Sequence, residues 1–297
     1  MKPAINLKLE LSLLGLLALL WGSSYLFIKI AVAEIPPITL IAVRVSGASL
    51  FLLLVLWVRN ERLPRDGSTW RRLAIQAFFN SIGAWTILAW GQQFVDAGLA
   101  SVLNSTSPIF VCIITALITR HERLGRMKLI GVVLGLSGVI LIVGIDSLQG
   151  LGTHSAGQLA CLLSAILYAM AAIYGKRFSQ LSAPATAAGT MIWASLVLVP
   201  AAIVLEQPWQ LDPGPLAILA TFILSILCTG TALLLYFRLV RTLGSLGVTS
   251  QSYLRAGIGV MLGIIVLGET LNLTVAAGLV AAILGVAMIN WPKRPGN

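Results

Sequence analysis

The stretch Asn104-Ser105-Thr106-Ser107-Pro108 decides how this chain folds, because it lies in the middle of an apolar run from about Gly98 to Thr119. A run of this length can cross a bilayer as a helix. Pro108 has no N–H, so the carbonyl of Asn104 loses its helical partner. Such a break is tolerated in a membrane only where hydroxyls, water or other protein groups satisfy the backbone. We therefore predict a broken helix that faces protein or a wet cavity.

A second polar stretch, Gln251-Ser252-Tyr253-Leu254-Arg255, lies 147 residues further along the chain in an equivalent apolar run. Matched interruptions in the two halves of a chain are the best sequence indication of a transporter's binding site. The alternative is that the Ser and Thr side chains only hold neighbouring helices together.

The composition is that of a polytopic membrane protein. Of the 297 residues, 58% are hydrophobic and 10% are charged, whereas a soluble domain has about 25% charged residues. Ten apolar segments are joined by connections too short to hold a soluble domain. Their approximate ranges are 9–32, 37–58, 73–94, 98–119, 128–146, 157–176, 183–205, 215–238, 246–267 and 273–291. The basic start resembles a signal peptide, but its apolar run continues to about Ala33, so we expect a first spanning helix.

Charge is distributed unevenly between alternate connections. The formal net charge of +10 might suggest a nucleic-acid partner, but the Lys and Arg residues cluster in connections on one side of the predicted bundle. The opposite connections carry no Lys or Arg, and their acidic residues are Glu34, Asp96, Asp146, Glu206, Asp212 and Glu269. Cationic connections face the cytoplasm. We therefore predict a multi-pass protein of a bacterial-type inner membrane, with both termini cytoplasmic, the lipid bilayer as its partner and no nucleic acid.

The two halves of the sequence match at a constant shift of 147 residues. The matching pairs include Pro37 and Pro184, Gly83 and Gly230, Ser105 and Ser252, and, as a conservative exchange, Trp21 and Tyr168. Each half has five segments, an odd number, so the second half enters the membrane upside down. We predict an all-α integral membrane protein with ten transmembrane helices in two inverted five-helix repeats, residues 1–147 and 148–297.

Several short motifs spread over nearly the whole chain carry a family resemblance. They are Leu19-Leu20-Trp21-Gly22-Ser23-Ser24, Lys29, Arg44, Ser107-Pro108, Glu122-Arg123-Leu124 and Gly268-Glu269-Thr270-Leu271. Together they resemble the ten-helix EamA-type family of the drug/metabolite transporter superfamily. The resemblance implies two inverted repeats around a central cavity that moves small metabolites, often outward, and the aromatic amino acid exporter branch is similar. The second repeat departs from the pattern, because Arg255 stands where the first repeat has its proline.

Three basic residues, Lys29, Arg44 and Arg255, lie outside the cationic connections. Arg255 is nine residues into its segment, or about 14 Å at 1.5 Å per residue, which is close to the midplane. A cation there costs at least about 2.5–3.5 kcal/mol, so we interpret Arg255 as an anion site or a gating partner. The alternative is a structural cation bonded to carbonyls freed near Pro108. Arg44 and Lys29 are gating or structural charges that can snorkel toward the interface.

The candidate substrate-binding residues are polar groups at the two interruptions, central aromatic residues, and one polar residue of the third segment. They are Trp21, Asn80, Trp85, Asn104, Ser105, Ser107, Pro108, Tyr168, Gln251, Ser252, Tyr253 and Arg255. For the aromatic residues the alternative is packing or lipid contact. No carboxylate lies deep in any predicted helix, which disfavours an exchange of protons for cations built on a buried acid.

The sequence thus favours a secondary transporter that exports small metabolites by alternating access through a central cavity. Neutral amino acids, aromatic ones included, are the first choice of substrate, and drugs, nucleosides or quaternary ammonium compounds are the alternative. An enzyme is not expected, because the chain lacks a phosphate loop, an HExxH motif and paired deep carboxylates. We expect no cofactor and no metal ion. A channel is disfavoured by the matched interruptions, and the oligomeric state stays open, with a monomer as one possibility.

The predicted orientation can be tested with single cysteines at positions 35 and 150, in connections that we place outside the cell. Both should react with an impermeant thiol reagent added to intact cells, because positively charged connections stay inside. Labelling that occurs only after the membrane is permeabilised would reverse the assigned orientation.

Overall fold

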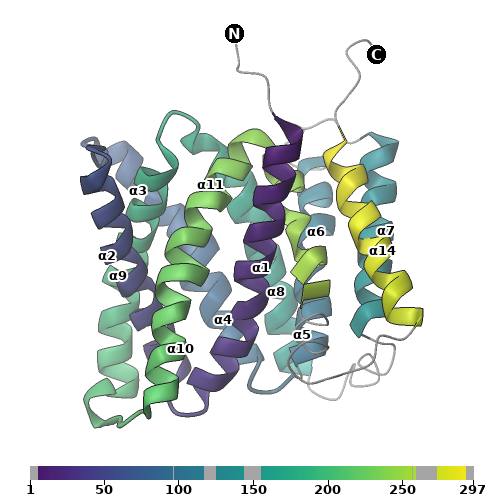
Figure 1. Cartoon of the computed structure of the whole chain (residues 1–297). Coiled ribbons are helices and arrows are strands. Elements are labelled where there is room, and N and C mark those ends of the chain that lie inside the picture. Colours follow the sequence, from purple (N-terminus) through teal and green to yellow (C-terminus); the bar gives the residue numbers. More distant parts are fainter. Residues whose placement is uncertain are drawn as a thin grey trace.

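The computed structural model describes residues 6–95, 97–116, 125–143, 155–255, 257–258 and 273–291. These residues form a bundle of helices that cross the molecule side by side (Figure 1), without a strand among them. Six of the helices are long and apolar enough to span a membrane, and shorter apolar helices accompany them. The predicted all-α membrane fold is confirmed.

Each of the ten predicted segments contains helical residues in the described part of the chain. The first half has α1 (Leu7–Val32), α2 (Pro37–Val58), α3 (Gly67–Ala77), the π-helical η1 (Phe78–Ile82), α4 (Gly83–Gly91), α5 (Ala97–Asn104), α6 (Ser107–Ile114) and α7 (Arg126–Val143). The second half has α8 (Ser155–Gly175), η4 (Lys176–Phe178), α9 (Ala183–Glu206), η5 (Pro208–Gln210), α10 (Pro215–Ser225), the π-helical η6 (Ile226–Thr231), α11 (Ala232–Thr242), α12 (Gly244–Thr249) and α14 (Leu273–Asn290).

Polar side chains fix where several of these helices begin. Asn6, Asp66 and Ser182 each accept a hydrogen bond from the backbone N–H three residues later, the usual way to satisfy free donors at a helix start. The start of α2 is capped from another helix: the Glu206 carboxylate accepts from the N–H groups of Ile38 and Thr39, at 3.1 and 2.6 Å. The carboxylate thus joins the end of α9 to the beginning of α2.

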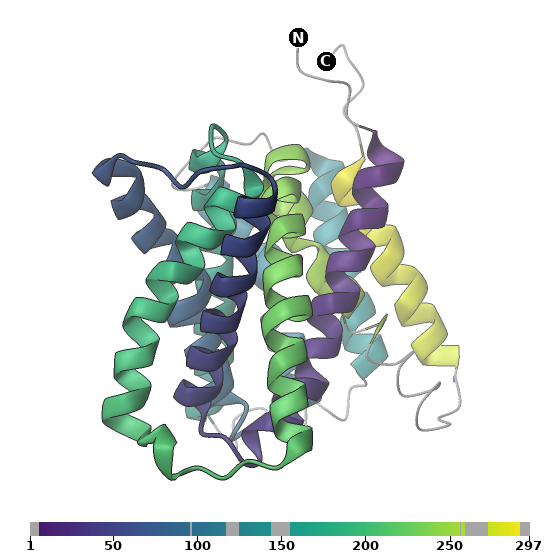
Figure 2. The same cartoon turned by 60° about the vertical axis from the view of Figure 1, so that its left-hand side comes forward.

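The helix bounds follow the internal repeat. A shift of 147 residues brings α2 onto α9 and α7 onto α14 within a residue, and the members of each pair pack against each other. The π-helical η1 and η6 also overlap under this shift. In Figure 2, α2 lies between α9 and α10. The two halves therefore meet along their equivalent helices, although the boundary proposed at 147/148 lies outside the described residues.

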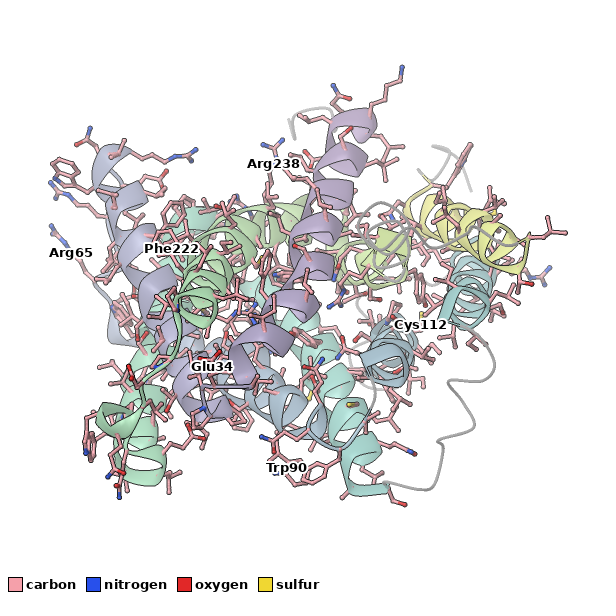
Figure 3. All side chains as sticks on the ribbon, turned by 60° about the horizontal axis from the view of Figure 1, so that its bottom comes forward. Glu34, Arg65, Trp90, Cys112, Phe222 and Arg238 are labelled. Carbon is pink, nitrogen blue, oxygen red and sulfur yellow. The ribbon has the colours of Figure 1, made fainter. Side chains whose placement is uncertain are left out.

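The two ends of the bundle differ in charge. The start of α1 and the end of α14 lie at the same end (Figure 1), together with the connection from α2 to α3. Arg65 lies in the connection from α2 to α3, and Glu34 lies between α1 and α2, at the opposite end of α2; Figure 3 labels both. This arrangement agrees with the separation of charge in the sequence. That the basic end faces the cytoplasm stays a prediction.

Helices α7 and α14 approach so closely that their backbones touch. A Cβ added at Gly138 would lie 2.5 Å from the Ala282 nitrogen and 2.6 Å from the Gly278 oxygen. A Cβ at Gly285 would lie 2.6 Å from the Gly135 nitrogen. Close packing of small residues drives helix association in lipid, where the hydrophobic effect between helices is absent. Glycine is therefore required along this contact.

Gly138→Ala should destabilise the protein by about 1–3 kcal/mol, because the added methyl group forces two helix backbones apart. Gly15→Ala is the matched control: a Cβ at Gly15 meets no atom within 4 Å, so the alanine should be neutral or stabilising by about 0.5–1 kcal/mol. Thermal unfolding of the purified proteins in detergent measures both. Equal midpoints for the two variants would contradict the close contact of α7 with α14.

Candidate functional site

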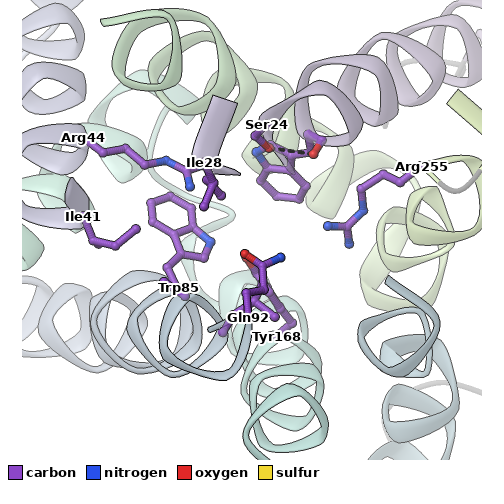
Figure 4. A pocket seen from close by; sticks show the side chains of 11 residues that line it. Ser24, Ile28, Ile41, Arg44, Trp85, Gln92, Tyr168 and Arg255 are labelled. Atoms are coloured by element: carbon purple, nitrogen blue, oxygen red, sulfur yellow. Dashed lines mark hydrogen bonds between the residues drawn. The ribbon is translucent and has the colours of Figure 1, made fainter. Parts of the chain in front are cut away.

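Two small cavities meet at the centre of the bundle, and Trp21, Tyr168 and Arg255 line both of them. Arg44, Trp85 and Gln92 are among the further lining residues of the first (Figure 4), which we call the outer chamber after the predicted orientation. We call the second the inner chamber. Its further lining residues are Ser107, Tyr236, Thr249 and Gln251.

The chambers are small. Their free volumes are about 20 Å³ and about 10 Å³, and a single water needs about 10–15 Å³ measured in the same way. The sequence predicted a central cavity that moves small metabolites, but this conformation has no room for a metabolite. The side chains around Trp21 must move apart before a substrate can enter.

Aromatic rings from both repeats form the wall between the chambers. The ring centroids of Trp21 on α1 and Tyr168 on α8 are 6.4 Å apart, and those of Trp21 and Tyr236 on α11 are 5.4 Å apart. Trp21 and Tyr168 are equivalent positions of the two repeats. Their meeting places the pseudo-symmetry axis of the bundle through this site.

Arg255 lies in the helical stretch 251–255 that follows α12, and its side chain is buried. Its Nη2 donates to the Oδ1 of Asn104 at 3.4 Å, and its Cζ lies 5.8 Å from the centre of the Trp21 ring. Asn104 in turn donates to Ser164, which donates to the Ala84 carbonyl. A polar chain through α5, α8 and α4 therefore orients the guanidinium at the centre of the bundle.

Arg44 is also buried and does not snorkel. Its Nε donates to Thr229 Oγ1 at 2.6 Å and its Nη2 to the Cys228 carbonyl at 3.4 Å. Its Cζ lies 4.3 Å from the centre of the Trp85 ring. The π-helical η6 thus supplies polar partners for Arg44, and the guanidinium reaches the outer chamber from the side opposite Arg255 (Figure 4).

The predicted helix break is confirmed. Helix α5 ends at Asn104 and α6 begins at Ser107, with Pro108 buried in its first turn. The Ser107 hydroxyl donates to the Asn104 carbonyl at 2.8 Å, so a neighbouring hydroxyl satisfies the group that proline leaves unpaired. Ser105 donates to the Ser252 carbonyl at 3.2 Å. The two polar stretches therefore meet at equivalent positions.

Other predicted residues lie away from the chambers. The Tyr253 ring packs against Gly135, and its hydroxyl donates to the Val132 carbonyl of α7 at 3.1 Å. Asn80 is buried in η1 and lines neither chamber. Ser252 is buried, lines neither chamber and accepts from Ser105 through its carbonyl. The side chain of Lys29 lies outside the described part of the chain.

Three polar atoms of the inner chamber have no hydrogen-bond partner among the described residues. They are the indole N–H of Trp21, the hydroxyl of Tyr236 and the Oε1 of Gln251, and all three side chains are buried. Buried polar groups are nearly always paired. These atoms can therefore bind a polar ligand or water. The indole N–H donates, the Tyr236 hydroxyl can donate or accept, and the Gln251 Oε1 accepts.

Sequence reasoning missed Tyr236 and Gln92 at the site, and one ion pair between two helices. Tyr236 and Gln92 lie near the ends of apolar runs, where nothing marked them as central. Glu10 is buried in the first turn of α1, where its carboxylate accepts from Arg238 at 2.8 Å and from Thr242 at 2.9 Å. In the sequence, only the presence of an acidic residue, Glu10, within the first apolar segment indicated that α1 makes such a contact with α11.

Comparisons with known proteins point to transporters. The model of the EamA-like transporter family matches residues 9–144 and 155–291. The uncharacterized inner membrane transporter YedA of Escherichia coli is 26% identical over 277 residues, which cover 93% of this chain and 89% of YedA. The uncharacterized transporter YoaV of Bacillus subtilis is 23% identical over 93% of this chain and 95% of YoaV. Protein PagO of Salmonella typhimurium is 26% identical over 78% of this chain and 77% of PagO.

A solved crystal structure of another protein matches the fold. It superposes with a TM-score of 0.77, covers 93% of this chain and 96% of that chain, and is 18% identical in sequence. At this identity the likeness concerns the fold alone.

Substituting two tyrosines by phenylalanine tests which tyrosine hydroxyl is available to bind a ligand. Tyr253→Phe removes a hydrogen bond to Val132 and should lower stability by about 1 kcal/mol. Tyr236→Phe removes a buried hydroxyl without a described partner, so stability should stay the same or rise. Thermal unfolding in detergent compares them. An equal loss in both variants would mean that the Tyr236 hydroxyl is already paired.

Proposed function

This chain belongs to the EamA-like transporter family, and we propose that it exports neutral amino acids, aromatic ones included, through the central site. The family and the relatives make it a multi-pass inner-membrane transporter. The substrate and the direction of transport are part of the proposal. The side-chain chemistry of the two chambers supports the choice of substrate.

The observation that carries the proposal is the combination of aromatic rings, a guanidinium and unpaired polar atoms around the inner chamber. Trp21, Tyr168 and Tyr236 offer rings to an aromatic or large apolar side chain, worth about 0.5–1.5 kcal/mol per ring pair beyond burial. Arg255 can bind a carboxylate with charge-assisted hydrogen bonds. The Oε1 of Gln251 can accept from an ammonium group. These are the parts of an amino acid.

Transport by alternating access needs the two repeats, which we take as residues 1–147 and 148–297, to move against each other. Trp21 and Tyr168 line both chambers, so a substrate that passes from one side to the other must displace them. Because the rings come from opposite repeats, a relative movement of the repeats separates them. The small free volume fits a conformation in which no substrate is bound and the rings lie together.

The main alternative cargo, lipophilic or quaternary ammonium cations, is disfavoured by charge. Two guanidinium groups line the outer chamber, and among the described residues no acidic side chain lines it. A like charge raises the free energy of a cation in a medium of low dielectric constant. Nucleosides remain the alternative that charge does not exclude.

Purified protein in sealed liposomes should exchange phenylalanine, methionine and leucine faster than empty liposomes do, in a counterflow assay that separates a carrier from a channel. Arg255→Ala should abolish most of this transport while the protein still inserts. Arg255→Lys should rescue it only partly, because an ammonium lacks the planar fork of a guanidinium. Tyr253→Phe is the control that should keep the wild-type rate.

The assay can also refute the assignment. Wild-type rates in Arg255→Ala would make this arginine structural. If all three amino acids move at the empty-liposome rate while a nucleoside or a quaternary ammonium compound moves quickly, the proposed substrate is wrong.

A further inference from the structure

Two contacts between the repeats lie near opposite ends of the bundle, at positions related by the shift of 147 residues. Where α1 begins (Figure 1), Glu10 contacts Arg238 and Thr242 at the end of α11. The equivalent positions are Gly157, Gly91 and Val95. They meet where α8 begins and α4 ends, after the span 67–91 has crossed the bundle. The inverted repeat therefore makes the same contact twice, once near each end.

The contact at the end where α1 begins is an ion pair. The Glu10 carboxylate is buried and accepts from Arg238 at 2.8 Å and from Thr242 at 2.9 Å. It lies 11 residues before Trp21, or about 16 Å along α1, and Arg238 lies two residues after Tyr236 of the inner chamber. A buried charge that loses its partner is strongly destabilised. Separating α1 from α11 at this end is therefore favourable only if water reaches Glu10.

The equivalent contact at the other end carries no charge and depends on close approach. Helix α4 ends at Gly91, and Gln92 directly after it lines the outer chamber. A Cβ added at Gly91 would lie 3.0 Å from the Gly157 oxygen, and one added at Gly157 would lie 2.9 Å from the Phe94 Cβ. Small residues let helix backbones approach in lipid, and van der Waals contact then holds the helices together. A larger side chain at Gly157 would push α4 away from α8.

We infer that these two equivalent contacts are the gates of the transport path. The ion pair of Glu10 holds the inner-chamber end together, and the contact of Gly91 with Gly157 holds the outer-chamber end together. Alternating access moves one repeat against the other around a fixed site, so one gate separates while the other stays in contact. The inference rests on the proposed function, because a path through the centre is part of it. It adds that charge controls one gate and side-chain size controls the other.

Two further equivalent positions can report on the gates. Cys161 lies one turn after Gly157 and is fully buried, and its Sγ would be 3.2 Å from a Cβ added at Gly91. Its equivalent, Leu14, lies one turn after Glu10 and is also fully buried. The experiment uses full-length protein in detergent with a single cysteine, either Cys161 itself or Leu14→Cys, and every other cysteine changed to alanine. The rate of reaction with a water-soluble maleimide then measures how often each position reaches solvent.

The two gates should respond to opposite substitutions. Arg238→Gln should raise the labelling rate of Leu14→Cys about tenfold or more and lower that of Cys161, because loss of the ion pair favours the state that is open at the inner-chamber end. Gly157→Ala should do the reverse, since its added methyl group would lie 2.7 Å from Val95 Cγ2 and force α4 from α8. A protein that is only less stable would label faster at both positions.

Matched variants separate gating from a general loss of stability. Arg238→Lys keeps the ion pair and should label as the wild type does. Arg241→Gln, on the same helix, removes a hydrogen bond to a backbone carbonyl away from α1 and should change neither rate. Gly67→Ala is the control for the glycine, because a Cβ there meets no atom within 4 Å. If Gly157→Ala does not fold, Val95→Ala weakens the same contact and should have the same effect on labelling.

The outcomes distinguish the gates from the proposed substrate. Unless the variants at the two gates change the two labelling rates in opposite directions, the inference is wrong. If the rates respond in this way while phenylalanine, methionine and leucine move at the empty-liposome rate, the gates stand and the amino-acid assignment falls. If the amino acids are transported and the labelling rates ignore both variants, the assignment stands and the gates fall.

Discussion

The structure depends on the rule that a backbone polar group inside a bilayer needs a partner within the protein. A broken helix can therefore exist only where side chains supply what the helix has lost. Here Ser107 satisfies the Asn104 carbonyl, and Ser105 binds the carbonyl of Ser252 from the other repeat. The interruption thus lies at the contact between the two halves, and the polar groups needed to repair it are also the ones that line or orient the site.

Equivalent residues of the two repeats form the aromatic part of the site, whereas its positive charges come from residues without an equivalent in the other repeat. Trp21 and Tyr168 are equivalent and meet at the axis. The two buried arginines have no basic equivalent: under the shift of 147 residues Arg44 corresponds to Met191 and Arg255 to Pro108. An inverted repeat can therefore provide two similar half-paths, while single residues without an equivalent in the other half, one in each repeat, place positive charge at the site.

Close packing of the helices also explains why the central chambers are small. Helices in lipid associate through van der Waals contact and a few polar bonds, as the glycine contacts between α7 and α14 show. The chambers at the axis are almost filled by the rings of Trp21, Tyr168 and Tyr236. Under the proposed function, the rings that fill the centre in this conformation are also the surface that a substrate contacts when the repeats separate.

The sequence by itself determined the ten apolar segments, the inverted repeat and the break before Pro108. The length of an apolar run, the charge of a connection and the missing N–H of a proline are local properties that can be read without the tertiary structure. It also placed Trp21, Trp85, Tyr168 and Arg255 near the centre by depth alone. Tertiary structure decided which way these helices face. A segment that is apolar on all sides carries little signal of its buried face, so Tyr253 could not be distinguished from a cavity residue, although it packs on α7. Arg44 turns inward and Tyr236 reaches the inner chamber for the same reason: contacts with η6 and Trp21 orient them, and those contacts exist only once the two repeats have packed together.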